Sequence, residues 1–223
     1  MLFPIGDDNI QSGHPAVFST LFLLLNVGVF IFQTSAPPGA QAALTNEWGA
    51  IPYEIVQGID LGTLFTSIFM HGSWLHLIGN MLYLWIFADN IEAVVGNFRF
   101  VVFYLLGGLT ASLTQIAFNP ISGIPIVGAS GAIAAVMGAY IVMFPGSRVK
   151  MLFLLLFMVF YVPSWVFLGI WFAQQALSGI GALGMEPEDS GGIAWWAHIG
   201  GFLFGLAAGY YFRRKFNTRW IHH

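Results

Sequence analysis

The sequence predicts an all-α membrane protein, a single bundle of six transmembrane helices with its N- and C-termini in the cytoplasm. Its 223 residues are 57% hydrophobic and only 8% charged, whereas about a quarter of the residues of a soluble domain are charged. Six apolar runs approach the ~20 residues that a helix needs to cross a bilayer. With six spans, every Lys and Arg falls on the same side of the membrane.

The six predicted helices form one domain over residues 1–223, because the chain shows no internal repeat and no low-complexity linker. They cover Pro15–Thr34, Leu75–Ile91, Phe98–Phe118, Val127–Phe144, Val149–Leu177 and Ile193–Phe212. The second and fourth are short, and the fifth is long enough to tilt or to extend past the membrane. No basic segment precedes the first apolar run, so we expect a retained helix there and not a cleaved signal peptide.

The basic residues set the expected orientation. They are Arg99, Arg148, Lys150, Arg213, Arg214, Lys215 and Arg219. Lys and Arg are concentrated in cytoplasmic loops, so the side that carries these residues is expected to be the inner one. Removing one span would scatter them over both sides, which supports the count of six. The long loop Ser35–Trp74 and the acidic loop Ser178–Gly192 then lie outside.

The loop Ser35–Trp74 is too long for a plain connection between helices. It is expected either to fold as an outer piece of the protein or to lie in the membrane interface. Trp48 and Tyr53 favour the interface, since Trp and Tyr prefer the level of the lipid headgroups.

Four polar residues stand out within the predicted helices: His76, Asn80, Ser130 and His198. Polar groups are costly in a bilayer and are therefore functional candidates. All four lie near the N-terminal ends of helices that run inward from the outer side. At a rise of about 1.5 Å per residue, Ser130 is about 5 Å and His198 about 8 Å below the start of its helix. The four residues are thus expected at a similar depth, in the outer third of the membrane.

Small residues follow both the serine and the histidine at helical spacing. They are Ala134 and Gly138 after Ser130, and Gly201, Gly205, Ala208 and Gly209 after His198. Small residues let two helix backbones approach closely in a membrane. If these two faces pack together, Ser130 and His198 come within reach of each other. His76 and Asn80 are spaced i, i+4 and share one face of their own helix.

This set of residues suits nucleophilic catalysis. A serine hydroxyl needs a base to take its proton, and a histidine is the usual base. The developing oxyanion needs fixed donors, which the Asn80 amide, the His76 ring and the Ser130 backbone N–H can supply. Gly128 would leave that backbone uncovered. No Asp or Glu falls inside a helix at the depth of His198, so the sequence predicts a Ser–His dyad without a carboxylate.

Each of these residues also has a plainer explanation. A lone serine on a small-residue face usually serves close packing, and a lone histidine or asparagine can hydrogen-bond two helices together. A metal site would use His76 and His198, with His71 further outward. Catalytic zinc usually takes three His or carboxylate ligands, the His71–His76 spacing is not i, i+4, and the sequence has no HExxH motif. We therefore expect no metal and no cofactor. Nothing in the sequence resembles a nucleic-acid-binding surface.

Three stretches carry a family resemblance. They are HGSWLHLIGNMLYLWIFADNIEAVVG (His71–Gly96), GASGAIAAVMG (Gly128–Gly138) and AHIGGFLFG (Ala197–Gly205). In their order and spacing they resemble the rhomboid intramembrane serine proteases, which have a six-helix core. The resemblance implies Ser130 as the nucleophile and His198 as its general base. It implies an oxyanion hole made by His76, Asn80 and the Ser130 backbone N–H.

The resemblance also implies a function, namely a serine endopeptidase that cleaves transmembrane segments of single-span membrane proteins near the outer face. Its partners would be those substrates and the lipid bilayer, and the fifth helix and the loop before the sixth would act as gate and cap. The alternative is a catalytically inactive rhomboid-like protein that binds transmembrane clients. A six-helix transporter would need a charged or broken-helix site at the midplane, and the sequence has no charged residue there. A bacterial inner membrane is the expected location.

Two further positions bear on the resemblance. Glu92 and Gly96 match a Glu-x-x-x-Gly of the family, which implies a structural feature on the inner side. Many members have an aromatic residue four positions after the serine, against which the histidine stacks. Here that position is Ala134, so His198 is expected to be held in another way, with Trp195 or Trp196 as candidates.

Overall fold

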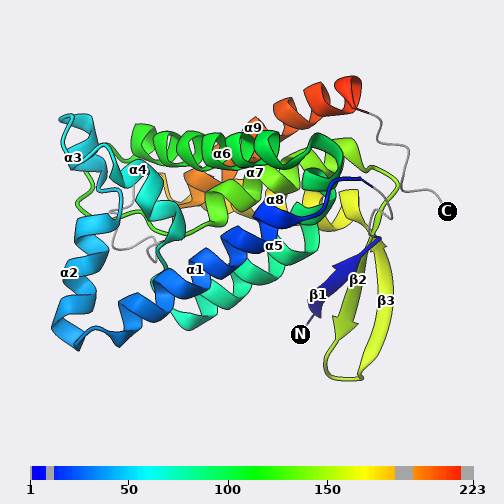
Figure 1. Cartoon of the computed structure of the whole chain (residues 1–223), viewed down its shortest axis with the longest axis horizontal. Helices are drawn as coiled ribbons and strands as arrows, with labels where there is room; N and C mark the ends of the chain where they lie inside the picture. Colours follow the sequence, from blue (N-terminus) through cyan, green and yellow to red (C-terminus); the bar gives the residue numbers. More distant parts are fainter. Residues whose placement is uncertain (1, 9–12, 184–192, 217–223) are drawn as a thin grey trace.

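The computed structural model describes residues 2–8, 13–183 and 193–216, and its long helices lie side by side in one bundle (Figure 1). The long helices are α1 (Val17–Ser35), α5 (Trp74–Val95), α6 (Asn97–Phe118), α7 (Ser130–Met143), α8 (Ser164–Gly181) and α9 (Trp195–Lys215). Between α1 and α5 come α2 (Pro38–Trp48), α3 (Pro52–Val56), α4 (Thr63–Thr66) and the 3-10 helix η1 (Ser67–Phe69). Each predicted helix overlaps one of the long helices.

Helix α7 is the centre of the bundle, and every residue from Gly131 to Tyr140 is buried. Helices α5, α6, α8 and α9 all contact it. It begins at Ser130, three residues later than predicted. The residues before it are bonded to the segment between α1 and α5: the Gly128 N–H donates to the Ser67 carbonyl at 2.9 Å, and Ile126 pairs with Ala50 as an isolated β-bridge.

The two small-residue faces pack against each other, as predicted from their spacing. A Cβ added at Gly205 would overlap the carbonyl oxygen of Ala135, and one at Gly138 would overlap that of Phe202. A Cβ at Gly201 would lie 3.3 Å from the Cβ of Ala134. Helices α7 and α9 are therefore in backbone contact, at a distance that only glycine permits at these positions.

The all-α prediction is wrong in one respect, because the chain also forms a three-stranded antiparallel sheet. Its strands are β1 (Leu2–Asp7), β2 (Arg148–Phe153) and β3 (Met158–Pro163), in the order β1-β2-β3. The hairpin of β2 and β3 extends from the bundle beside the N-terminus (Figure 1). The predicted fifth helix, Val149–Leu177, is therefore wrong in its first half, since α8 begins only at Ser164.

The local sequence accounts for this hairpin. In β2, Val149 and Met151 are buried, whereas Arg148 is exposed and Lys150 half-buried, which is the period of two that a strand requires. Pro163 ends β3 and occupies the N-cap position of α8, where its missing N–H leaves no helix bond unmade. An uninterrupted apolar run does not by itself separate strand from helix, and this is why hydropathy alone suggested one long span.

Two of the described helices, α1 and α6, are both long enough and apolar enough to cross a membrane by length and composition. Helix α7 is apolar but has only 14 residues, or about 21 Å at the usual rise. It is enclosed by its neighbours and so lies in protein more than in lipid. The count of six spans remains a prediction.

The outer loop Ser35–Trp74 is folded, in agreement with one of the two alternatives considered for it. Ala50, Ile55 and Leu64 form a small core of their own with Ile116 of α6. The backbone N–H of Tyr53 donates to the Ser122 carbonyl at 3.1 Å. The loop is thus fastened to the end of α6, and its placement in the membrane interface remains a prediction.

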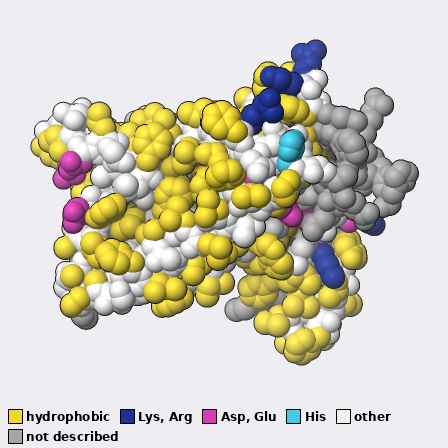
Figure 2. Space-filling view, viewed as in Figure 1, with side chains coloured by type: hydrophobic (Ala, Val, Ile, Leu, Met, Phe, Trp, Pro, Cys, Tyr) yellow, Lys and Arg dark blue, Asp and Glu magenta, His cyan; other side chains and the backbone are white. Residues whose placement is uncertain are grey.

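The described basic residues gather at one end of the bundle (Figure 2). The described basic residues lie where α5, α7 and α9 end, and three of them, Arg213, Arg214 and Lys215, form the last turn of α9. The acidic side chains of the outer loop lie at the opposite end (Figure 2). Arg219 and the acidic part of the loop before α9 lie outside the described residues. Which end faces the cytoplasm stays a prediction.

Candidate active site

Ser130 and His198 are in direct hydrogen-bond contact. Ser130 is the first residue of α7 and His198 lies in the first turn of α9. The Ser130 Oγ is 2.8 Å from the His198 Nε2. The contact follows from the glycine packing, because a Cβ at Gly201 would overlap the carbonyl oxygen of Gly131, one residue beyond the serine. The small-residue faces of α7 and α9 thus do more than pack the two helices, because their close contact brings the two side chains together.

The second ring nitrogen of His198 is bonded to a residue that the sequence reasoning did not include. The Gln175 Oε1 of α8 lies 2.7 Å from the His198 Nδ1. An amide oxygen only accepts, so Nδ1 carries the ring proton and Nε2 presents its lone pair to the serine hydroxyl. This is the tautomer that a general base requires.

Of the two tryptophans considered as supports for His198, Trp195 lies beside the ring and Trp196 does not. Trp171 and Trp195 flank the imidazole, with centroids 5.8 and 6.3 Å away. Trp196 instead stacks on Phe118, with centroids 3.6 Å apart. An aromatic side chain in place of Ala134 would have no room, since Ala134 is fully buried against the backbone of α9.

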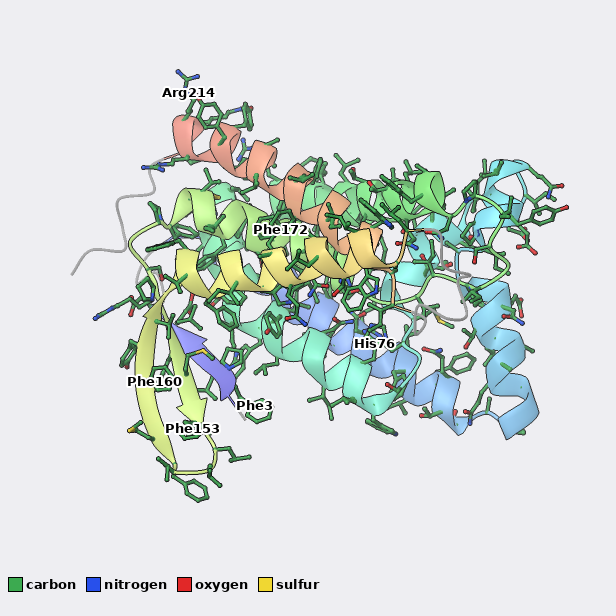
Figure 3. All side chains as sticks on the ribbon, turned by 180° about the vertical axis from the view of Figure 1, so that it is seen from behind. Phe3, His76, Phe153, Phe160, Phe172 and Arg214 are labelled. Carbon is green, nitrogen blue, oxygen red and sulfur yellow. The ribbon has the colours of Figure 1, made fainter. Side chains whose placement is uncertain are left out.

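His76 and Asn80 lie on α5 beside the backbone that leads into Ser130. Gly128 has a φ of +119°, and a Cβ there would lie 2.6 Å from the His76 Cε1 and 3.5 Å from the Asn80 Nδ2. Only glycine tolerates both the conformation and the close approach. Figure 3 shows His76 near the N-terminal end of α5, on the side that faces the other helices.

His71, which the sequence analysis considered only as a possible metal ligand, contacts the oxyanion-hole candidate Asn80. Its Nε2 lies 2.9 Å from the Asn80 Nδ2, and the side chain is 2% exposed. The side-chain amide of Gln33 on α1 forms two hydrogen bonds with the backbone of His71. It accepts from the His71 N–H at 3.1 Å and donates to the His71 carbonyl at 3.3 Å. Burial lowers the pKa of His71 to about 3, so the ring stays neutral and its Nε2 can accept from Asn80.

One partly open cavity of about 800 Å³ has His76, Asn80, Ser130 and His198 among its lining residues. Trp171 and Trp195 line it as well. Within the described parts of the chain, no group of three or more His, Asp or Glu residues gathers as a metal site would require. The arrangement brings together a nucleophile, a base and amide or imidazole donors, which are the groups that acyl transfer requires.

A family model described as the Rhomboid domain matches residues 60–215. The chain belongs to the rhomboid family. It is 28% identical over 207 residues to the presenilin-associated rhomboid-like protein, mitochondrial, of Bos taurus, and 30% identical over 207 residues to the Homo sapiens protein of that name. It is 29% identical over 199 residues to the rhomboid protease GluP of Bacillus subtilis.

Each of these alignments covers 89% of this chain, but only 49%, 48% and 36% of the Bos taurus, Homo sapiens and Bacillus subtilis proteins. The chain thus spans about half or less of the length of these relatives. Family membership makes it a membrane protein with a mostly helical rhomboid domain. The relatives are named as mitochondrial and as bacterial, so a bacterial inner membrane remains a prediction.

Proposed function

We propose that this rhomboid domain is a serine endopeptidase that cleaves transmembrane segments of single-span membrane proteins near the outer face. The observation that carries the proposal is the 2.8 Å contact between the Ser130 Oγ and the His198 Nε2 inside an open, partly polar cavity. A serine kept only for packing needs no hydrogen bond to an imidazole of the correct tautomer. The name of the relative GluP, a rhomboid protease, supports the reaction class.

In the proposed first step, His198 removes the hydroxyl proton of Ser130 as the Oγ attacks the carbonyl carbon of the scissile peptide. The carbonyl oxygen becomes an oxyanion, which accepts hydrogen bonds from the Ser130 backbone N–H, the Asn80 amide and the His76 ring. Asn80 has two N–H groups, and only one is engaged by His71. The other is free to serve the oxyanion.

The peptide C–N bond then breaks, and His198 donates its new proton to the leaving amine. The carbonyl carbon stays bonded to Ser130 as an ester. A water molecule, deprotonated by His198, attacks this ester; the bond to Ser130 breaks, His198 returns the proton to the Ser130 Oγ, and the carboxylic acid is released. The open cavity gives water the access that this second half requires.

The location of cleavage follows from the distribution of charge. The dyad lies at the end of the bundle where α7 and α9 begin, and the described basic residues lie at the other end. With basic residues inside, both termini are cytoplasmic and the cavity opens toward the outer face. A substrate helix would have to unwind at this depth before its backbone could reach Ser130.

A catalytically inactive protein that binds transmembrane clients is the second candidate, since the relatives include proteins named only as rhomboid-like. Cleavage of a model single-span substrate in liposomes separates the two functions, with wild type compared to Ser130→Ala and His198→Ala. We expect cleavage only by the wild type, and equal activity in the control Ser35→Ala, which changes an exposed serine at the end of α1. Undiminished cleavage by Ser130→Ala would refute the nucleophile. A fluorophosphonate probe that fails to label the folded wild type would favour the inactive protein.

A further inference from the structure

We propose that Gln175 of α8 is the positioning residue of the dyad, which holds the His198 imidazole in the tautomer and orientation that let Nε2 take the serine proton. This inference rests on the proposed function and gives the site the third member that the acidic residues do not supply. The contact that carries it is the 2.7 Å hydrogen bond between the Gln175 Oε1 and the His198 Nδ1.

Gln175 is a polar side chain in a buried position, and its burial calls for a hydrogen-bond partner. Helix α8 buries only a narrow face, made by Ser164, Leu168, Gln175 and Gly179. Gln175 itself is 5% exposed. Burial of an amide without a partner is costly, and its oxygen is bonded to His198. The adjacent Gln174 has the same side chain but is exposed, so amides on α8 are not buried by default.

One turn further along the same face, Gly179 sets the distance between the two helices. A Cβ at Gly179 would lie 2.9 Å from the Cδ1 of Ile199 and 3.5 Å from the Cβ of Trp195. The absence of a side chain there lets α8 approach the first turn of α9. That approach brings the amide of Gln175 within reach of the imidazole.

The chemistry of an amide differs from that of the aspartate in a soluble triad. Both accept from Nδ1–H and so fix the tautomer, but the amide has no negative charge with which to stabilise the imidazolium. Among the described residues, the ionisable side chain that acts on His198 electrostatically is His76 of α5. Gln175 therefore orients His198 but leaves the positive charge of the His198 imidazolium uncompensated.

A consequence follows from the position of α8 at the edge of the bundle. Most of its side chains are exposed or half-buried, so α8 is the least enclosed of the helices that contribute to the site. Any displacement of α8 from α9 would break the bond between Gln175 and His198. His198 is thus held in the orientation of a general base only while α8 is packed against α9.

The test is the rate at which a fluorophosphonate probe labels Ser130, measured against pH in detergent. The probe is small, so its rate reports on the dyad and not on the entry of a substrate helix. We expect Gln175→Ala and Gln175→Leu to label at least about tenfold more slowly. The loss should be smaller than the ~10⁴ seen when a charged orienting group is replaced in a soluble triad. Thermal unfolding measured in parallel identifies any variant that fails to fold.

The discriminating variant is Gln175→Glu, which keeps an acceptor at Nδ1 and adds a charge that favours the imidazolium. It should label within a few-fold of the wild type at its optimum, and the acidic limb of its pH–rate profile should move to higher pH. A purely structural role for Gln175 would not move that limb. The control is Gln57→Glu, which introduces the same charge at an exposed glutamine that does not line the cavity and should leave the limb in place.

Labelling of Gln175→Ala and Gln175→Leu at the wild-type rate would overturn the positioning role, as would a Gln175→Glu profile that coincides with the wild type. Absence of labelling in the wild type itself is a different failure, because it removes the nucleophile and with it the proposed function. The two failures are therefore told apart by the wild-type sample.

Discussion

The carboxylate of Glu92 on α5 accepts the backbone N–H of Phe18 at 2.8 Å, although the two residues are 74 positions apart. Its other oxygen accepts the N–H of Ser19, also at 2.8 Å. The first N–H groups of a helix have no partner within that helix, and at the start of α1 no side chain of the helix itself caps them. Glu92 thus caps α1 from a different helix, and it places a negative charge at the positive end of the α1 dipole.

Glu92→Ala is therefore predicted to destabilise the fold by about 2–4 kcal/mol, because two backbone donors, one buried and one partly buried, lose a charged acceptor. Glu92→Gln should cost less, since one amide oxygen can still accept. Thermal unfolding in detergent measures both. The control is Glu47→Ala, an exposed residue of α2, which should change stability by no more than about 0.5 kcal/mol. An equal loss in the control and in Glu92→Ala would contradict the capping role.

Asn80 and His71 are predicted to act as a unit in the oxyanion hole. Asn80→Ala removes an oxyanion donor and should slow the chemical step by about 10²–10³-fold. His71→Ala removes the acceptor that orients the Asn80 amide, so it should slow the step by less and leave substrate binding unchanged. Probe labelling and cleavage rates measure these effects.

The double variant gives the sharper result for this pair. If His71 works through Asn80, then His71→Ala should have little further effect once Asn80 is already alanine. Effects that simply multiply would mean that His71 contributes through some other contact. Both single variants should fall short of the loss in Ser130→Ala.

Asp7 gives the fold a predicted pH dependence. Its carboxylate accepts hydrogen bonds from the Tyr140 hydroxyl and from the Asn90 amide, the latter at 2.7 Å. Burial, and to a lesser extent the nearby Asp89 and Asp8, raises the pKa of Asp7 to about 7. A carboxyl whose pKa is higher folded than unfolded stabilises the fold most when it is protonated.

The contribution of Asp7 should therefore be complete below about pH 4 and be lost as the pH rises through about 7. Asp7→Asn mimics the neutral form. We expect it to match the wild type near pH 4 and to have the higher unfolding temperature near pH 8, where its free energy of unfolding should be larger by on the order of 4 kcal/mol. A constant difference between the two proteins across this range would rule out titration of Asp7 as the cause.

The pairing of Ser130 with His198 could be predicted because it depends on helix periodicity and depth, which a sequence displays. The β2–β3 hairpin could not, since strand and helix both accept an unbroken apolar run. Gln175 was missed for a related reason. A search for a third catalytic member among acids passes over a neutral amide, and Gln175 lies near the C-terminal end of its helix, whereas the four candidates were sought near N-terminal ends.

His71 illustrates a different limit. Its sequence neighbours mark it as one of several histidines, and only the three-dimensional contact with Asn80 shows that it orients a donor. The capping of α1 by Glu92 is likewise a contact between distant parts of the chain. Periodicity within one helix predicts which side chains share a face, but it does not predict which group on another helix completes their hydrogen bonds.

Glycine packing between α7 and α9 gives the last prediction, which links stability to catalysis. A Cβ at Gly205 would overlap the carbonyl oxygen of Ala135, which is backbone and cannot rotate away. Gly205→Ala should therefore push the two helices apart, lower the unfolding temperature and slow the labelling of Ser130. By contrast, Gly169 of α8 has open space where a Cβ would stand. Gly169→Ala should be neutral or stabilise by up to about 1 kcal/mol, as expected for glycine to alanine within a helix.

The two alanine variants thus make the same chemical change with opposite expected outcomes. Labelling at the wild-type rate by a destabilised Gly205→Ala protein would show that the dyad tolerates separation of α7 and α9. In that case the 2.8 Å contact between Ser130 and His198 would have to be maintained by the remaining partners of His198, with Gln175 first among them.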